Sequence, residues 1–303
     1  MEKSSSLPGD SSSTGLASLF SRNKTRLLSK VVPGWANNQI DTMLFVPKSI
    51  HSKPVRLPRG FEQFIIKTHD GNLQAYQTGR GPTVVFVHGW GGASAQFFPL
   101  MRGLARCGFS ALVFDHLGHG LSDSKSATLQ QSIITTNHGL SQVRKSNDGM
   151  CAVVGHATGC IAIANSRPAL LKDIPLFLIS PVFNYKLFFL KRLVKLRLHA
   201  DLVKKYANRF SKTYHSEYKK LELAEKLGRY GDISVIAHDE TDKESAVADS
   251  VEFCKRYPLT KLMLTRDTDH FRIINSESVW QELKAHLNYE DTTINFTSEI
   301  VNQ

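Results

Sequence analysis

From Gly60 onward, short apolar runs alternate with longer segments of helical composition. Such short continuous runs are typical of strands that are buried on both faces. This alternation predicts an α/β fold with a mostly parallel central sheet that carries helices on both faces. The expected strands are Thr83–Val87, Ala111–Phe114, Ala152–Val154, Leu176–Ile179, Ser234–Ala237 and Lys261–Thr265, and the expected helices include Ala95–Cys107, Thr158–Ala169, Ser245–Arg256 and Ser278–Leu287.

An antiparallel hairpin is expected before the parallel part of the sheet. Phe64–Lys67 and Leu73–Gln77 flank Asp70-Gly71-Asn72, which is a turn signal between two strand-like segments. In parallel sheets, functional groups gather at the carboxyl ends of the strands. The segments that directly follow the strands are therefore where catalytic residues are expected.

Two glycine-rich turns follow the first two apolar runs. His88-Gly89-Trp90-Gly91-Gly92 comes directly after the first, and its backbone N–H groups could stabilise a developing oxyanion. A tight turn that merely needs glycine is the alternative. The second turn, residues 114–122, reads FDHLGHGLS, and its aspartate and glycines suit a hydrogen-bonded turn with a structural role.

The third motif is Val153-Val154-Gly155-His156-Ala157-Thr158-Gly159, between a buried strand and a helix. This is the frame of G-x-S-x-G, the nucleophile elbow, in which a strained turn presents a serine at the end of a strand. Its two glycines allow the strand and the helix to approach closely. The central position should be serine, cysteine or aspartate, and here it is Ala157.

An acidic loop and a late histidine follow in that order. Asp242 lies in the loop after the strand Ser234–Ala237, where Asp239 and Glu240 are competitors closer to the strand end. His270 lies in the loop after the last strand. A lone histidine is more often a polar surface residue than a base. The order acid then histidine, each after a strand, favours a catalytic pair.

From about Arg59 to Leu287 the chain resembles the α/β-hydrolase superfamily, which implies that fold with a helical lid insertion. It is particularly similar to a proteobacterial branch of serine hydrolases with an HGW loop, a D-x-x-G-H-G-x-S turn, a G-H-S-x-G elbow, an H-D-x-x-D acid loop and a late G-H loop. The stretch Leu44-Phe45-Val46-Pro47 also resembles an arm that precedes the domain in these relatives. Asp269 stands where the relatives usually have glycine.

The resemblance implies five site residues, carried over position by position. Asp242 matches the acid and His270 matches the base. Trp90 and Thr158 match the residues whose backbone N–H groups form the oxyanion hole. Ala157 matches the nucleophile position and departs from it. Since alanine has no lone pair, no acyl-enzyme can form there. Loss of the serine alone costs about 10⁶ in kcat in subtilisin.

None of the neighbouring side chains is expected to replace the serine. Thr158 and Cys160 lie on the following helix, and His156 precedes the apex and should face the other way. Three interpretations stay open: an inactive pseudohydrolase retained for ligand or partner binding, an esterase-like hydrolase whose serine was changed deliberately to Ala157, or an enzyme that uses Asp242 and His270 as a general base without a covalent step.

The segment between the strands Leu176–Ile179 and Ser234–Ala237 is where a lid is expected, over about residues 180–231. Its apolar residues recur at three- and four-residue steps and predict one buried helical stripe. The other faces are basic, which leads us to expect at most weak contact with anionic membranes. A small acyl or ester compound is the expected ligand. The predicted stripe consists of Phe183, Leu187, Leu190, Val194, Leu198 and Leu202.

Composition sets the remaining expectations. Residues 1–15 are Ser-rich and should be disordered, 16–58 should form an N-terminal arm, and 59–303 the hydrolase domain. The start of the chain has no apolar signal-like stretch, so a cytoplasmic protein is expected. The four cysteines are widely spaced, so neither a metal nor a cofactor is expected. The net charge of +11 is spread along the chain, so no nucleic-acid partner is expected.

Overall fold

The computed structural model describes residues 42, 44, 46–47, 56–124, 127–145, 149–213 and 218–287, without the side chains of 213 and 231–233. The strands are β1 (Phe61–Thr68), β2 (Gly71–Thr78), β3 (Thr83–Val87), β4 (Ser110–Phe114), β5 (Met150–His156), β6 (Leu176–Ile179), β7 (Ser234–Asp239) and β8 (Lys261–Thr265). The α-helices are α4 (Phe98–Arg106), α5 (Leu129–Arg144), α6 (Thr158–Ala164), α7 (Pro168–Leu171), α8 (Tyr185–Lys195), α9 (Ala200–Thr213), α10 (Leu223–Leu227), α11 (Val247–Arg256), α12 (Asp269–Arg272) and α13 (Glu277–His286). Short 3₁₀ segments are η1 (Ser94–Phe97), η3 (Lys219–Leu221), η4 (Gly228–Ile233) and η5 (Ile273–Asn275).

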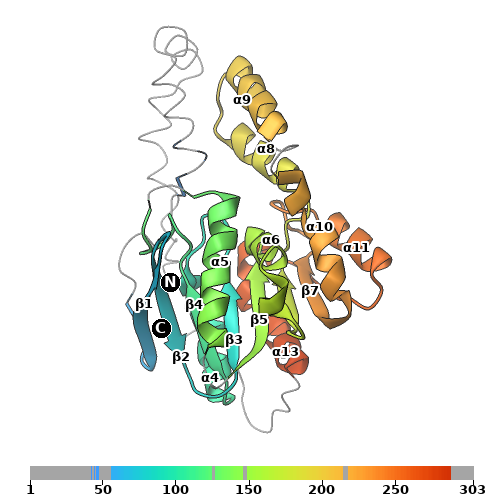
Figure 1. Ribbon diagram of the computed structural model, residues 1–303. Coiled ribbons are helices and arrows are strands. Elements are labelled where there is room, and N and C mark those ends of the chain that lie inside the picture. Colours follow the sequence, from blue (N-terminus) through green and yellow to red (C-terminus); the bar gives the residue numbers. More distant parts are fainter. Residues whose placement is uncertain are drawn as a thin grey trace, which may run out of the picture.

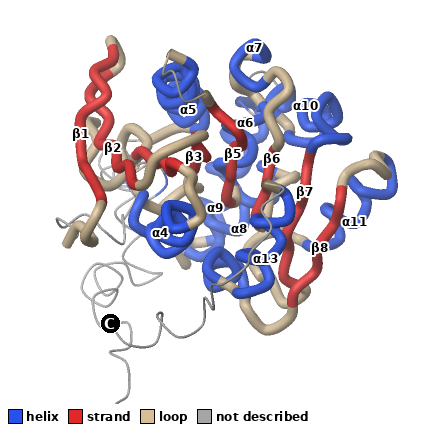
Figure 2. Tube along the Cα trace, turned by 90° about the horizontal axis from the view of Figure 1, so that it is seen from below, coloured by secondary structure: helices blue, strands red, loops and turns tan. Residues whose placement is uncertain are grey.

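In the described part of the chain, the strands form one eight-stranded sheet in the order β1-β2-β4-β3-β5-β6-β7-β8. β2 pairs antiparallel with β1 and with β4, and every pair from β3–β4 to β7–β8 is parallel. Figure 2 shows the strands side by side from β1 at one edge to β8 at the other. The predicted α/β fold with a mostly parallel sheet is confirmed.

Helices cover both faces of the sheet, as Figure 2 shows with α4 and α13 on one side and α5, α6 and α10 on the other. Within β3, Val84 and Phe86 belong to the core under α4 and α13, whereas Val85 and Val87 belong to the core under α5 and α6. Because successive side chains point to opposite faces, a strand covered on both sides must be apolar throughout. This explains the continuous apolar runs. The edge strand β8 is partly exposed.

The helix expected over Thr158–Ala169 is shorter in the structure. α6 ends at Ala164, and a separate short helix, α7, begins at Pro168. Arg167 has φ −57° and ψ 124°, outside the helical region. A proline disfavours the helical conformation in the residue before it, so Pro168 prevents one continuous helix.

The insertion between β6 and β7 contains α8, α9 and α10, and Figure 1 shows α8 and α9 standing beyond one end of the sheet. The predicted apolar stripe is partly wrong, because the side chains of Leu187 and Val194 are 43% and 63% exposed. α8 instead buries Tyr185, Phe189 and Leu193. α8 has apolar residues on more than one side, and the stacking of Phe189 on a phenylalanine of α9, at 3.6 Å between ring centroids, selects the buried face.

Most of the predicted arm, and all of the Ser-rich tail, lies outside the described residues. Leu44 is described, is buried, and belongs to the core that also contains Ile66 and Leu73. The arm and the domain boundaries stay predictions. None of the helices in the described part of the chain has the length and apolar character needed to span a bilayer.

Candidate active site

Ala157 occupies a strained turn between β5 and α6. Its φ of 52° and ψ of −119° place a residue with a Cβ in a region that costs about 1–3 kcal/mol. The turn is held from both sides, because the N–H of Ala157 donates to the carbonyl of Ile179 at 3.0 Å and the N–H of Val182 donates to the carbonyl of Ala157 at 3.4 Å. The elbow conformation is therefore present although the side chain at its apex is only a methyl group.

Two glycines allow the loop of residues 88–92, the HGW loop, to pack against this elbow. A Cβ on Gly159 would lie 2.5 Å from the carbonyl oxygen of Val87, at the end of β3. A Cβ on Gly89 would lie 2.8 Å from the Cβ of Ala157. Contacts this short do not occur, so only glycine fits at both positions. The backbone of the loop therefore lies directly beside position 157, where an oxyanion-binding loop is needed.

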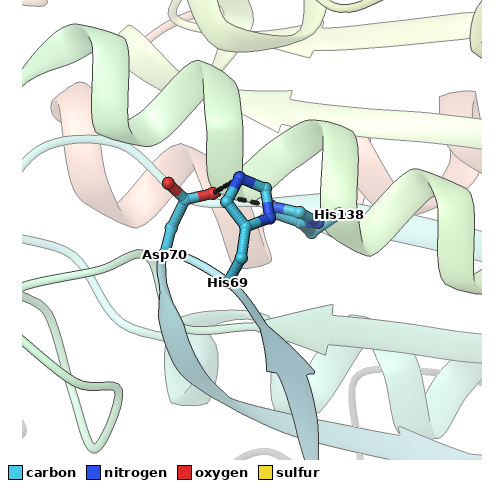
Figure 3. Close-up of side chains that lie close together, drawn as sticks. All are labelled: His69, Asp70 and His138. Atoms are coloured by element: carbon cyan, nitrogen blue, oxygen red, sulfur yellow. Dashed lines mark hydrogen bonds and ion pairs between the residues drawn. The ribbon is translucent and has the colours of Figure 1, made fainter.

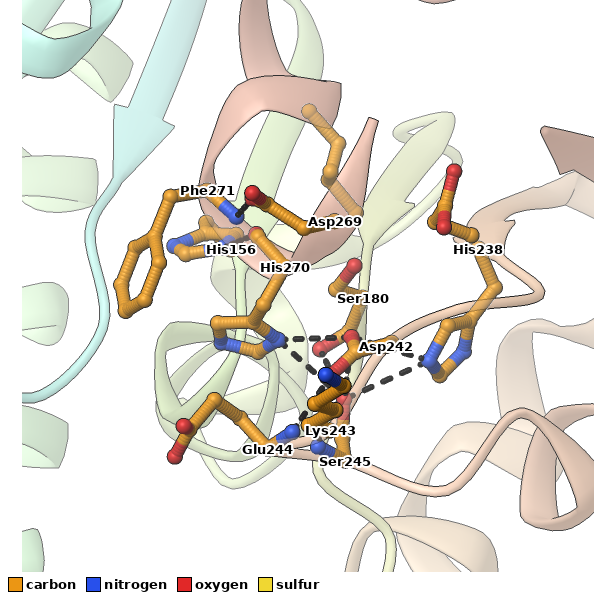
Figure 4. A network of polar contacts seen from close by, with 12 residues as sticks. His156, Ser180, His238, Asp242, Lys243, Glu244, Ser245, Asp269, His270 and Phe271 are labelled. Atoms are coloured by element: carbon orange, nitrogen blue, oxygen red, sulfur yellow. Dashed lines mark hydrogen bonds and ion pairs between the residues drawn. The ribbon is translucent and has the colours of Figure 1, made fainter. Parts of the chain in front are cut away.

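The predicted acid and base are in direct contact (Figure 4). His270, in the short helix α12, places its Nδ1 2.7 Å from Oδ2 of Asp242, which follows β7. Both side chains are buried, with 5% of His270 and none of Asp242 exposed. An Nδ1–H···carboxylate bond fixes the orientation of the imidazole and leaves Nε2 as the proton acceptor, which is the arrangement of a general base.

Asp242 is the centre of a larger network that sequence reasoning missed. His238 lies with its Nε2 3.2 Å from Oδ2, and the Ser245 hydroxyl lies 3.0 Å from the same oxygen. The N–H groups of Glu244 and Ser245 donate to Oδ1. Burial by itself would raise the pKa of Asp242, but the hydrogen bonds from His238 and His270 outweigh it and hold that pKa well below its usual range. The carboxylate is therefore ionised.

The competing acids have other partners. Oδ2 of Asp239 accepts hydrogen bonds from the hydroxyls of Thr265 and Thr268. Glu240 forms an exposed ion pair with Arg266. Neither is placed to orient His270, so the choice of Asp242 among the three acids agrees with the geometry.

His156, which precedes the apex, contacts the segment that carries His270. Its Nε2 lies 2.9 Å from the carbonyl oxygen of His270, to which it donates a hydrogen bond. Burial, followed by the nearby imidazole of His270, lowers the pKa of His156 to about 3. A neutral His156 therefore holds the backbone of the base, a role that no spacing rule would have revealed.

One of the expected oxyanion donors in the loop after β3 is already hydrogen-bonded within the protein. The N–H of Trp90, one of the two expected donors, donates to Oγ1 of Thr158 at 2.8 Å. The neighbouring N–H of Gly91 donates to Nε2 of His119 at 3.1 Å. The backbone N–H of Thr158 has no acceptor among the described residues. One of the two expected donors is thus occupied by a hydroxyl from within the site.

Neither Cys160 nor Thr158 is positioned to act as a nucleophile in place of a serine at position 157. Cys160 is fully buried, its Sγ lies 4.0 Å from the carbonyl oxygen of Ile179, and burial raises the pKa of its thiol. A thiol in this state is not a nucleophile. The hydroxyl of Thr158 is engaged by Trp90.

Asp269 preserves the loop that glycine would form. Its φ of 59° lies in the left-handed region, which favours glycine but which aspartate tolerates. Its carboxylate accepts hydrogen bonds from the N–H groups of Phe271 and Arg272, at the start of α12. These hydrogen bonds support the short helix α12, which carries His270.

A cation from α8 lies over the oxyanion loop. The guanidinium carbon of Arg192 is 4.8 Å from the centroid of the Trp90 ring. Burial lowers the pKa of Arg192, although Tyr185 and Glu244 oppose this effect. Among the described residues, no carboxylate forms an ion pair with it. A partly buried cation over the Trp90 ring, without an ion-pair partner among the described residues, is suited to bind an anion.

Two lysines of α8 bind to the loop after β7 that carries Asp242. Lys191 donates to the carbonyls of Lys243 and Glu244, and Lys195 forms an ion pair with the Glu244 carboxylate. These lysines therefore face the body of the protein. Contact of the basic insertion with anionic membranes stays a prediction.

Comparisons with known proteins agree with this fold. A model of the family described as "Serine aminopeptidase, S33" matches residues 80–268. An esterase of Pyrococcus furiosus superposes with a TM-score of 0.59 at 18% identity, over 80% of this chain and 98% of its own. An α/β hydrolase of a Penicillium species superposes with a TM-score of 0.58 at 13% identity, over 77% of this chain and 98% of its own. A Butyrivibrio proteoclasticus protein with bound ferulic acid superposes with a TM-score of 0.55 at 18% identity, over 75% of this chain and 97% of its own. A sequence search of curated proteins gives no match.

Proposed function

Because this chain belongs to the serine aminopeptidase S33 family of α/β hydrolases, we propose that it binds a small ester- or acyl-type ligand at a serine-hydrolase site without forming an acyl-enzyme. The observation that carries the proposal is Ala157 at a strained elbow beside an intact His270–Asp242 pair. A site that keeps its base, its acid and its oxyanion loop retains the shape that recognises an acyl group. It lacks the atom that would attack, and one expected oxyanion donor is occupied by the hydroxyl of Thr158.

The α8–α10 insertion supplies the recognition chemistry in this proposal. Arg192 is held by the insertion over Trp90, next to the elbow. A hydrogen bond to a charged group contributes about 1.5–3 kcal/mol when it is formed in a shielded place. The ligand is therefore an acyl compound that carries a carboxylate or another anionic group, and the insertion acts as the lid that covers it.

Two matched amides test this binding. The 4-nitroanilides of butyric acid and of glutaric acid differ by a terminal carboxylate and resist hydrolysis. Isothermal titration calorimetry should show tighter binding of the glutaric compound. Arg192→Gln should weaken that binding about tenfold, which corresponds to about 1.4 kcal/mol. Lys195→Gln is the control, because this lysine is on the same helix but is already paired with Glu244.

Equal affinity for the two anilides, or an unchanged affinity in Arg192→Gln, would contradict the proposed ligand class. Turnover of 4-nitrophenyl butyrate by the chain as it stands, abolished by His270→Ala, would favour the general-base alternative instead. Measurements of binding and of hydrolysis on the same protein therefore distinguish a ligand-binding site from a general-base enzyme.

The hydroxyl of Thr158 is expected to hinder oxyanion binding. In an Ala157→Ser background, Thr158→Val keeps the shape of the side chain and frees the N–H of Trp90. A neutral hydrogen bond contributes about 1 kcal/mol net, so kcat for 4-nitrophenyl butyrate should rise about fivefold. A fall in kcat would show that the hydroxyl itself donates to the oxyanion, and would refute this role.

A further inference from the structure

A second group of side chains lies outside the site, where the imidazoles of His69 and His138 meet the carboxylate of Asp70 (Figure 3). We propose that these three residues bind a divalent transition-metal ion, with zinc as the best fit. His69 and Asp70 form the turn between β1 and β2, and His138 lies on α5. None of the three touches the His270–Asp242 pair, so this inference does not depend on the proposed function.

The distances match a tetrahedral ion along two of three edges. Oδ2 of Asp70 lies 3.1 Å from Nε2 of His69 and 3.0 Å from Nε2 of His138. Zinc–ligand bonds of about 2.0–2.2 Å require neighbouring ligand atoms about 3.3 Å apart in a tetrahedron. All the ligand atoms lie within 4.8 Å of one another. The remaining edge, between the two nitrogens, can close by rotation of His69, whose side chain is 82% exposed.

The kinds of ligand also select the ion. Two imidazoles and one carboxylate suit zinc, copper or nickel, whereas calcium and magnesium prefer oxygen ligands. Three protein ligands on an exposed surface leave a fourth position open to water. Without an ion, both Nε2 atoms must carry a proton to bond to the same carboxylate oxygen. A metal satisfies all three groups at once.

The two elements that carry the ligands are held independently of any ion. The hydroxyl of Thr68 accepts a hydrogen bond from the N–H of Asp70 at 3.1 Å and donates to the carbonyl of Gly71 at 2.6 Å, which fixes the turn. On α5, the buried side chain of Leu140 packs into the core two residues beyond His138. A partly preformed site of this kind loses little entropy when the ion binds. Binding would clamp the β1–β2 turn to α5.

This proposal differs from the expectation from sequence that no metal is bound. No local spacing pattern indicates it, because His138 lies 68 positions after Asp70 and 69 after His69. Only the packing of α5 beside the hairpin brings them together.

Zinc chloride titrated into the full chain, stripped with EDTA and dialysed, tests the proposal. Calorimetry should show one site per chain that is tighter than any other, with micromolar affinity, and the unfolding midpoint should rise by about 5 °C at a hundredfold excess over Kd. Cobalt(II) should give the intense visible absorption of a tetrahedral complex. His138→Gln should lower the zinc affinity at least tenfold and abolish the shift in the midpoint.

His199→Gln is the matched control, since His199 lies 3.3 Å from the carboxylate of Asp201 without a second imidazole. Its zinc affinity should equal that of the unchanged chain. Equal losses in His138→Gln and His199→Gln, or zinc binding unaffected by His138→Gln, would overturn the proposal. If His138→Gln alters the unfolding midpoint in EDTA, His69→Gln applies the same test at an exposed side chain.

Discussion

Replacing Ala157 by serine is expected to raise the hydrolysis of 4-nitrophenyl butyrate at least 10³-fold above that of the chain as it stands. Deleting the serine costs about 10⁶ in a fully tuned enzyme, and we expect part of that to return, because the hydroxyl of Thr158 occupies one oxyanion donor here. The elbow already has its strained conformation, with φ of 52°. The new oxygen would therefore be attached to a Cβ that is already at the apex.

Two further variants show whether the gain comes from the intended chemistry. Ala157→Ser combined with His270→Ala should lose most of the activity, because the base that accepts the serine proton is gone. Cys160→Ser places a hydroxyl three residues further on, at a fully buried position, and should stay as inactive as the chain itself. A folded Ala157→Ser protein without activity would show that the site is deficient in more than its nucleophile.

The free energy of unfolding is expected to fall steeply between pH 6 and pH 4. His88, His116, His119 and His156 are all buried. Burial, and then the neighbouring imidazoles, lowers the pKa of His119 and of His156 to about 3, and burial lowers the pKa of His88 and of His116 below the usual value. In the unfolded chain each of these imidazoles titrates near 6.5.

The sign follows from proton uptake. A group whose pKa is lower in the folded state stabilises the protein above the unfolded pKa, and this stability is lost as the pH falls below about 6.5 toward the folded value. Each such histidine contributes about 1.4 kcal/mol per pH unit in that window. His119 and His156, whose folded pKa lies near 3, together give a slope of up to about 2.8 kcal/mol per pH unit, against a total stability of about 5–15 kcal/mol. The loss of stability should therefore begin above the pH at which the carboxylates protonate.

Urea unfolding measured at several pH values in EDTA gives this slope. His119→Gln should reduce it by about 1.4 kcal/mol per pH unit, because the amide can still accept from the N–H of Gly91 without binding a proton. His69→Gln is the control, since that side chain is largely exposed and should leave the slope unchanged. A flat free energy of unfolding between pH 6 and pH 4.5 would contradict the account of neutral buried histidines.

The features that could be predicted from sequence are those that a local pattern determines. Continuous apolar runs such as Thr83–Val87 require two covered faces. Most strands of the sheet could be predicted from such runs. The frame Gly155–Gly159 indicated an elbow, and a Cβ would lie 2.5 Å from the Ile163 side chain at Gly155 and 2.5 Å from the carbonyl oxygen of Val87 at Gly159. Asp242 and His270 were found because each follows a strand in a fixed order.

The features that were missed depend on packing between distant segments. α5 was not predicted because it is rich in Thr, Ser and Asn, whose side chains bond to carbonyls one turn earlier, for example Thr135 to Gln131 and Asn137 to Ile133. The hydrogen bond from His156 to the carbonyl of His270 spans 114 positions. In each case the partner is supplied by the fold, and no spacing rule contains it.

Covalent labelling by a fluorophosphonate probe, followed by intact-mass spectrometry, tests most directly whether this site lacks only its nucleophile. The chain as it stands should take up no probe, Ala157→Ser should gain one adduct per chain at position 157, and Ala157→Ser with His270→Ala should label far more slowly. The opposite result would be a single, His270-dependent adduct on the unchanged chain. That outcome would show that another side chain attacks the probe, and that the site is reactive although position 157 is alanine.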